Sequence, residues 1–307
     1  MKKQADVLKN LDGSRIRAVL VPISRLADIK NEIIKFRERE KLNEYQKNIT
    51  FDSYVLDLPE LEFEPKSILI AVTKYNLIKI KFIWQGKIVT DIGKLTEDEA
   101  EIPNIIKSCG VSFEDIFWLP QKRLAVQSGL AEYGRNNVTF VPDWGSFFGI
   151  DTYITDVPCR VNHIWRSAVC MAICDSCGLC IRDCPTGSIR NNRFLINNEN
   201  CLSHILANML GGGEPLPDWL PPGAVNSLSG CLRCQLKCPP NREMLKNITD
   251  EIIFGEYETD LMLNGVARDH LPPETQEKLN AVNLRDWRYD GIPRNLKNMF
   301  DNVIKGE

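Results

Sequence analysis

The sequence predicts an α+β fold, and three observations lead to this prediction. The first 110 residues mix strand-like apolar runs with amphipathic helical patterns. Eight of the eleven cysteines then crowd between Cys174 and Cys238. After Asn241 the chain returns to helical periodicity. Hydrophobic residues make up 43% and charged residues 26%, a balance that excludes a disordered or fibrous protein.

The domain organisation follows from these three regions. A chain of 307 residues has room for about two domains. We expect an α/β domain at residues 1–160, a cysteine-rich domain at 161–249, and a helical C-terminal extension at 250–307 that is too short for a domain. The formal net charge is −3 and the pI is about 5.8, so the chain lacks the basic excess of a protein that coats nucleic acid.

The first elements are two strands, a helix and a hairpin. Residues 16–22 form an apolar run typical of a buried strand, and residues 67–73 form a second one. Ser24 is a suitable N-cap, and apolar residues spaced by three and four predict a helix over 24–47. Alternation over 76–91 predicts a hairpin that turns at Gln85-Gly86.

The later elements are shorter. Thr96 to Glu99 is a capping-box pattern that opens a helix, which Gly110 closes. We expect a helix at 124–130, a turn at 133–137, a strand at 138–141, and a strand or helix at 150–157. Three helices are predicted near the end of the chain, at 242–253, 273–282 and 295–304.

The chain carries no segment that predicts export or a membrane span. Charged residues follow Met1 at once, with neither an apolar signal core nor paired arginines. The apolar stretch at residues 68–72 has the length of a strand, whereas a membrane helix needs about 20 apolar residues. We therefore expect a cytoplasmic protein, because a reducing cytoplasm keeps thiols available for metal.

The cysteine spacing predicts two [4Fe–4S] clusters. The first run has the C-x2-C-x2-C-x3-C-P spacing of bacterial ferredoxins, in which three cysteines ligate one cube and the fourth ligates its neighbour. The second run has three cysteines, so one ligand must come from elsewhere. Cys201, between the two runs, is the leading candidate. The first cube then has the ligands Cys174, Cys177, Cys180 and Cys238, and the second has Cys184, Cys201, Cys231 and Cys234.

Zinc sites or unused thiols are the alternatives to this scheme. Zinc prefers two separated C-x2-C pairs and rarely uses a C-x2-C-x2-C-x3-C-P run such as the first one here. Cys109, Cys159 and Cys170 lack any such spacing, and we expect each to be a small buried residue.

Motifs on both sides of residue 160 resemble one family. Between residues 115 and 241 the chain is similar to the epoxyqueuosine reductases, which are relatives of the reductive dehalogenases. The motifs that carry this resemblance are Ser128-Gly129-Leu130, Tyr133-Gly134-Arg135-Asn136, Gly145-Ser146-Phe147-Phe148, Thr155-Asp156-Val157-Pro158, Pro185-Thr186-Gly187-Ser188-Ile189 and Cys234-Gln235-Leu236.

The resemblance implies a fold and a set of cofactors. It implies that residues 1–160 form a nitroreductase-like α/β domain that binds cobalamin base-off. It also implies that residues 161–249 form a ferredoxin-like domain whose two clusters feed the cobalt. The cluster ligands of the family fall on the same eight cysteines, Cys201 included. Ferredoxin or flavodoxin would be a suitable electron donor.

The resemblance also implies two candidate proton donors. The general acid of the family falls on Asp115, although a shift to Glu114 or a helix-capping Asp remain the alternatives because the surrounding motif differs. Tyr133 is the second candidate, since the dehalogenases use a tyrosine as proton donor.

Five residues are implied to bind the cofactor. Arg135 would steer an anionic substrate group or the phosphate of the corrin, and Asn136 stands next to it in the same motif. Thr139, Ile150 and Tyr153 fall where the family lines the corrin ring, and ordinary core packing is the alternative.

The function predicted from these features is a cobalamin-dependent iron–sulfur reductase. Its substrate would be epoxyqueuosine in tRNA or a smaller molecule. The alternatives are a double-cluster electron-transfer protein and an activator that reduces a corrinoid protein without turnover of its own. The side chains near the C-terminus that could contact tRNA are Lys278, Arg285, Trp287, Arg288, Arg294 and Lys297.

Overall fold

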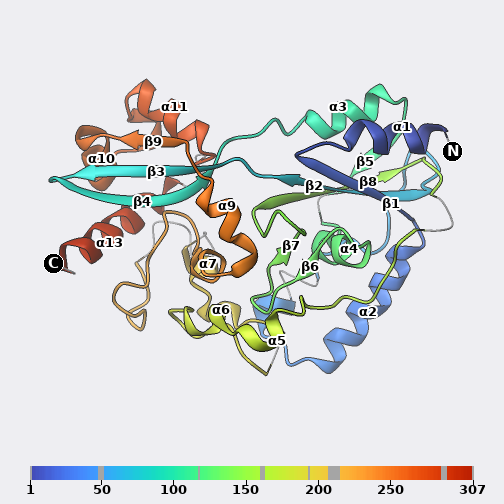
Figure 1. Cartoon of the computed structure of the whole chain (residues 1–307), viewed down its shortest axis with the longest axis horizontal. Coiled ribbons are helices and arrows are strands. Elements are labelled where there is room, and N and C mark those ends of the chain that lie inside the picture. Colours follow the sequence, from blue (N-terminus) through green and yellow to red (C-terminus); the bar gives the residue numbers. More distant parts are fainter. Residues whose placement is uncertain are drawn as a thin grey trace. The chain divides into compact units, whose positions relative to one another are not determined.

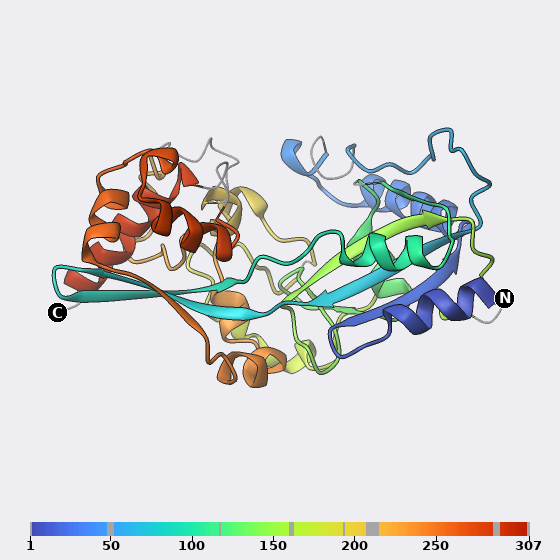
Figure 2. The same ribbon diagram turned by 90° about the horizontal axis from the view of Figure 1, so that it is seen from above.

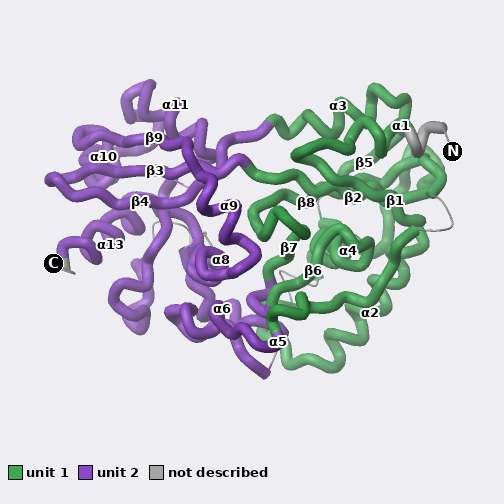
Figure 3. The backbone as a smooth tube through the Cα atoms, viewed as in Figure 1, with its two compact units in different colours: residues 1–75, 98–134, 138–174 green, residues 76–97, 135–137, 175–307 purple. Residues whose placement is uncertain are grey.

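The computed structural model of the chain forms two compact units, coloured in Figure 3. It describes residues 2–47, 52–116, 118–159, 163–192, 194–206, 215–284 and 289–305. Unit 1 comprises Met1–Tyr75, Asp98–Gly134 and Val138–Cys174, and unit 2 comprises Asn76–Glu97, Arg135–Asn137 and Asp175–Glu307. The predicted boundaries at residues 160 and 249 stay a prediction, but residues 76–97 of the first predicted domain fall in unit 2.

The core of unit 1 is a four-stranded antiparallel sheet with the order β1-β2-β8-β5. Its strands are β1 (Ile16–Pro22), β2 (Ser67–Lys74), β8 (Phe148–Thr155) and β5 (Phe113–Asp115). Every residue of β2 except the last is buried, because helices cover both faces of the sheet. This burial accounts for the uninterrupted apolar run that predicted the strand.

Different helices cover the two faces of this sheet (Figure 1). On one face, α1 (Lys2–Leu11) and α3 (Glu101–Ser108) share an apolar cluster with Leu69, Ala71 and Tyr153. Successive strand residues point to opposite faces, so Thr152 lies on the other face, where its hydroxyl is 3.5 Å from Nε2 of Gln121. Gln121 begins α4 (Gln121–Gln127), and α2 (Arg25–Arg39) is joined to α4 by an ion pair.

Unit 2 is built on a hairpin that is joined by a third strand. Strands β3 (Leu77–Trp84) and β4 (Lys87–Lys94) are antiparallel, and β9 (Glu251–Phe254) pairs in parallel with β3. Gln85 and Gly86 have φ values of 47° and 69°, the left-handed pair that a two-residue hairpin turn needs. Figure 2 shows the C-terminal helices packed along this hairpin, and they are α10 (Glu256–Leu263), α11 (Pro273–Ala281) and α13 (Ile292–Lys305).

The predicted hairpin and the α+β class are confirmed, and two of the predicted elements are wrong in part. Residues 150–157, predicted as a strand or a helix, lie largely in β8, a strand. The helix predicted over 24–47 ends at Arg39. The helix predicted over 242–253 is only α9 (Arg242–Lys246), and the residues after it enter β9. Isoleucines and phenylalanine dominate β9, and pairing with β3 satisfies the backbone of the strand.

The capping box predicted at Thr96 is also wrong, because a tertiary contact takes its hydroxyl. Thr96 donates to the carbonyl of Asn280 at the end of α11. Helix α3 begins at Glu101, and its N-cap is Ala100, whose N–H donates to Oδ1 of Asp98 at 2.9 Å. Gly110, at φ 66°, follows the end of α3 as predicted.

Two further findings concern the chain as a whole. Among the described residues, no helix combines the length and the apolar character that crossing a membrane requires. Three of the side chains considered for tRNA, Arg285, Trp287 and Arg288, lie outside the described residues.

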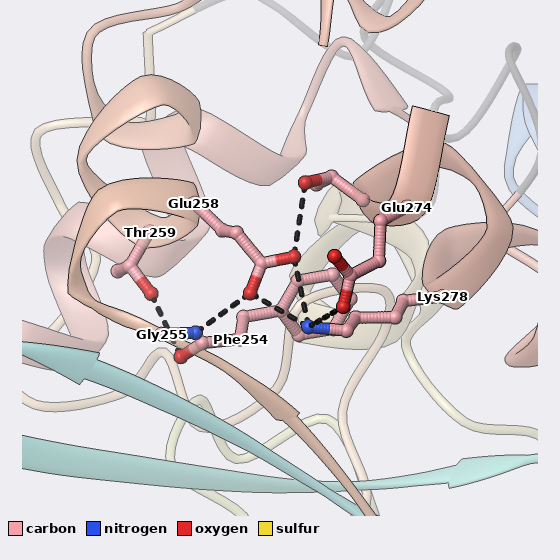
Figure 4. A network of polar contacts seen from close by, with 7 residues as sticks. Phe254, Gly255, Glu258, Thr259, Glu274 and Lys278 are labelled. Carbon is pink, nitrogen blue, oxygen red and sulfur yellow. Dashed lines mark hydrogen bonds and ion pairs between the residues drawn. The ribbon is translucent and has the colours of Figure 1, made fainter. Parts of the chain in front are cut away.

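A partly buried carboxylate network joins α10 to α11 in unit 2 (Figure 4). Nζ of Lys278 lies 2.9 Å and 2.8 Å from the two carboxylate oxygens of Glu258. The N–H of Gly255 and the hydroxyl of Thr275 also donate to this carboxylate, at 2.8 Å and 2.9 Å. Burial acts to raise the pKa of Glu258, but the hydrogen bonds from Lys278, Gly255 and Thr275 outweigh it and lower the pKa.

We therefore expect Glu258→Gln to destabilise the protein by about 1–3 kcal/mol at neutral pH. A lowered folded-state pKa means that the stabilising contribution is complete above the unfolded pKa near 4.5 and is lost as the pH falls through the lower folded value. The difference in unfolding free energy between variant and wild type should therefore shrink on acidification. Parallel unfolding curves of the two proteins at several pH values measure it.

Glu274→Gln is the matched control. Its carboxylate lies 3.7 Å from the same Lys278 nitrogen but is 81% exposed. An exposed pair of this kind contributes about 0–1 kcal/mol, so this variant should remain close to wild type at every pH. Equal destabilisation by the two variants would contradict the role assigned to burial.

Candidate functional site

The first cysteine run is shaped by two one-turn helices. Helix α5 (Cys174–Cys177) and helix α6 (Leu179–Arg182) are separated by Gly178 at φ 63°. A side chain at this position would be strained by that φ, and its Cβ would approach Nη1 of Arg182 to 3.2 Å. Glycine therefore allows the sharp reversal that the C-x2-C-x2-C spacing requires.

Four cysteine thiols of unit 2 influence one another, and they are those predicted for the second cube. Burial raises the pKa of Cys201, and the negative charges of Cys231 and Cys184 raise it further. Burial likewise raises the pKa of Cys234 to about 12, and the charges of Cys231, Cys201 and Cys180 add to this effect. The four thiols are therefore neighbours although 50 residues separate the first from the last in sequence.

Backbone N–H groups surround two of these sulfurs. For Cys184, burial acts to raise the pKa, but N–H groups of Thr186, Ile189 and Ser188 donate to the sulfur and lower the pKa overall. Backbone donors from Ser203 and His204 oppose the effect of burial at Cys201 in the same way. Such donors stabilise a thiolate, which is the form that binds iron.

The residues present fit two [4Fe–4S] clusters. The predicted donor set is eight cysteines, and those of the second cube lie together among hydrogen-bond donors. Within the described ranges, no three Cys, His, Asp or Glu side chains converge closely enough for a single metal ion.

The three cysteines left out of the ligand set all lie in unit 1. Cys109 accepts a hydrogen bond from Asn10 at 3.3 Å, and the thiol of Cys159 donates to the carbonyl of Leu20 at 3.1 Å. Both are partly buried, but Cys170 is exposed, so its prediction as a buried residue is wrong. Cys170 is held by a parallel backbone bridge to Tyr133.

Tyr133 lies among charged side chains of unit 1. It is 8% exposed and pairs with Thr139 across the strands β6 (Glu132–Tyr133) and β7 (Thr139–Phe140). Burial raises its pKa well above the usual range of tyrosine, an effect that the nearby Arg123 opposes and that Glu32 reinforces. The phenol therefore keeps its proton at neutral pH and is able to donate it.

An ion pair fixes the charges beside Tyr133. Nε and Nη2 of Arg123 lie 3.0 Å and 2.8 Å from Oε2 of Glu32. Nε2 of Gln127 donates to the same oxygen at 2.6 Å. Sequence reasoning missed Glu32, Arg123 and Gln127, because their contacts join α2 to α4 and no local spacing predicts which surface residues of two helices meet.

Asp115 lies on the opposite face of the sheet from this cluster. It ends β5 directly opposite Tyr153, and paired residues of neighbouring strands point to the same face. That face is covered by α1 and α3, whereas Arg123 and Gln127 belong to α4 on the other face. Asp115 is exposed, and burial followed by the charge of Glu114 raises its pKa. The structure does not bring the two candidate proton donors together.

The five residues predicted to bind the cofactor are divided between the two units, and within unit 1 Ile150 and Tyr153 lie on opposite faces of β8. Arg135 belongs to unit 2, where it donates to the carbonyl of Asn191 at 2.9 Å and lies 4.0 Å from Asp175. Asn136 is buried and belongs to the same unit. In unit 1, the ring of Tyr153 packs edge-on against Phe113 in the core, on the opposite face of β8 from Ile150. Their roles toward a cofactor stay predictions, as does that of Thr139.

The comparison with protein families identifies the cysteine-rich segment. Residues 173–241 match the family of the 4Fe-4S double cluster binding domain, and this range contains all eight predicted ligands. The fold and the match together define a class, an α+β protein with a double [4Fe–4S] cluster domain.

Within that class the chain resembles the epoxyqueuosine reductases. It is 26% identical over 277 residues to the enzyme of Cyclobacterium marinum, which covers 89% of this chain and 82% of that protein. It is 29% identical over 143 residues to the enzyme of Salmonella typhimurium, which covers 47% of this chain. That match spans about a third (34%) of the length of the Salmonella protein.

Solved structures of this group share the fold of the chain. The epoxyqueuosine reductase of Bacillus subtilis matches 98% of this chain and 81% of that one, with a TM-score of 0.60 and 20% identity. An epoxyqueuosine reductase bound to an epoxyqueuosine-modified tRNA-Tyr stem loop matches 98% of this chain and 80% of that one, with a TM-score of 0.60 and 18% identity.

The cluster scheme makes a prediction for Cys201. Cys201→Ala should remove the second cube and leave the first, so that iron falls from about eight to about four atoms per chain. Iron and sulfide analysis after anaerobic purification measures this. Cys109→Ser, in unit 1, is the control and should retain about eight. Full iron content in Cys201→Ala would contradict the assignment.

Proposed function

We propose that the chain is a cobalamin-dependent iron–sulfur reductase of the epoxyqueuosine reductase type. The observation that carries the proposal is the match of residues 173–241 to a double-cluster domain, within which the charges of Cys184, Cys201 and Cys231 raise the pKa of other predicted ligands. When bound, the clusters would supply single electrons and a base-off cobalamin would supply a strong reductant. A protein that only carries electrons needs the cluster domain alone. The presence of unit 1 beside that domain in the same chain therefore supports a reaction beyond electron transfer.

The chain's own residues would hold the clusters in an interleaved manner. Cys174, Cys177 and Cys180 would bind one cube together with Cys238 from the second run. Cys184, the fourth cysteine of the first run, would bind the other cube together with Cys201, Cys231 and Cys234. Each run therefore contributes to both cubes, so neither half of residues 173–241 forms a complete site.

Tyr133 is the proton donor in this proposal. Its pKa is raised by burial, so the phenol is protonated at neutral pH, and Arg123 provides a positive charge that stabilises the phenolate after transfer. Asp115 is exposed and lies on the other face of the sheet, away from the helices that carry Arg123 and Glu32. We therefore assign the proton to Tyr133 in preference to Asp115.

The substrate in this proposal is epoxyqueuosine in tRNA. The support is the complex of a structurally similar epoxyqueuosine reductase with a modified tRNA stem loop. The predicted C-terminal contacts give little support, because Lys278 is paired with Glu258. A cytoplasmic location and a ferredoxin or flavodoxin donor complete the proposal.

An anaerobic reconstitution tests the function. Holoprotein incubated with cobalamin should bind about one corrinoid per chain and convert epoxyqueuosine in tRNA under a low-potential reductant. Uptake without turnover would favour an activator of a corrinoid protein, and no uptake would favour an electron carrier. Optical spectra and nucleoside analysis measure the two steps.

Two variants locate the proton donor. Tyr133→Phe should retain iron and corrinoid but lose turnover by about a hundredfold or more, because it removes the acidic proton. Asp115→Asn should retain turnover close to wild type. The reverse pattern would assign the proton to Asp115.

A further inference from the structure

A side-chain amide contacts the sulfur of Cys231. Nδ2 of Asn226 lies 3.3 Å from Sγ of Cys231 and 2.7 Å from the carbonyl oxygen of Ala224. Oδ1 of the same side chain accepts from the N–H of Leu232 at 3.4 Å. These contacts fix the amide orientation, because only the oxygen can accept from Leu232 and only the nitrogen can donate to the carbonyl. The nitrogen of Asn226 therefore faces the sulfur.

The loop that carries Asn226 is anchored by a buried carboxylate. Oδ2 of Asp91, on β4, accepts from the hydroxyl of Ser227 at 2.9 Å and from the N–H of Leu228 at 2.7 Å. Asp91 is 6% exposed. From the other side, Nδ2 of Asn295 on α13 donates to the carbonyl of Leu228 at 2.7 Å. The loop is therefore held between the hairpin and the last helix.

This loop closely approaches the segment that carries the predicted ligand Cys201. Gly230 has φ 89°, and a Cβ there would lie 3.1 Å from Oγ of Ser203. Ser203 belongs to α7 (Leu202–Leu206), which directly follows Cys201. A larger residue at position 230 would push Cys231 away from Cys201, so the anchored loop sets the separation of two predicted ligands.

We propose that Asn226 raises the reduction potential of the cluster held by Cys184, Cys201, Cys231 and Cys234, and that Asp91 positions Asn226. The inference rests on the double-cluster part of the proposed function and is independent of cobalamin and substrate. Reduction adds negative charge to a cube, and part of that charge resides on its sulfurs. Hydrogen bonds to the sulfurs stabilise the reduced form more than the oxidised form and so raise the potential.

An EPR-monitored redox titration of the anaerobic holoprotein tests the proposal. Asn226→Leu keeps the approximate size of the side chain and removes the donor. At a fixed potential, the ratio of the reduced to the oxidised form of the second cube should fall about tenfold. This change corresponds to a fall of about 59 mV in the reduction potential of a one-electron couple. Asn264→Leu, a distant exposed asparagine bound to Asp260, is the control and should leave the ratio unchanged.

The role of Asp91 has its own variants. Asp91→Leu removes the two hydrogen bonds by which Asp91 holds the loop, and it should lower the ratio of reduced to oxidised cluster as Asn226→Leu does. Asp91→Asn retains an acceptor and should therefore recover most of the wild-type ratio. Combining Asp91→Leu with Asn226→Leu should add little, because the two act through the same hydrogen bond.

Iron analysis separates the possible failures. About eight irons with an unchanged ratio in Asn226→Leu would overturn the proposal. If Asn226→Leu loses iron, Asp91→Leu decides, and an unchanged ratio in that variant would overturn the proposal. Fewer than about four irons in the wild type would refute the double-cluster function itself, whereas absent substrate turnover would leave this inference intact.

Discussion

The rest of the structure depends on one electrostatic constraint in unit 2, where several neighbouring cysteine sulfurs must become negatively charged thiolates to bind metal. Burial raises the pKa of Cys201, Cys231 and Cys234, and the charges of neighbouring cysteines raise it further, because both disfavour the thiolate. Metal binding needs that thiolate, so the chain must stabilise negative sulfur by other means. It does so with backbone N–H groups at Cys184 and Cys201 and with the amide side chain of Asn226 at Cys231.

This requirement explains why unit 2 includes a hairpin from early in the chain. Strands β3 and β4 supply the apolar face on which α10, α11 and α13 pack, with Phe82 stacked 4.8 Å from Phe254. The same hairpin carries Asp91, which holds the loop before Cys231. A loop with four prolines and a glycine between residues 215 and 223 cannot order itself through regular secondary structure, so anchors from distant elements fix its continuation.

The sequence predicted what local spacing encodes. The cysteine runs gave the double-cluster domain, and alternation with Gln85-Gly86 gave the hairpin. What it missed depends on tertiary contacts. Thr96 caps the end of α11 instead of its own helix, and β9 exists because β3 offers an edge. Asn226 and Asp91 have no local signal, since one acts on a cysteine five residues away and the other on a loop more than 130 residues away.

Strand alternation also limits what a family resemblance can assign. Ile150 and Tyr153 both occupy β8, and their separation by three residues places them on opposite faces of a sheet that is covered on both sides. The same parity separates Asp115 from the α2–α4 cluster around Tyr133. Roles assigned to residues from their sequence position alone therefore need a structural test, which is whether the residues lie on the same surface. In unit 1 that test favours the face of Tyr133, Thr139 and Arg123, where a buried phenol, its cross-strand partner and a paired guanidinium lie near one another.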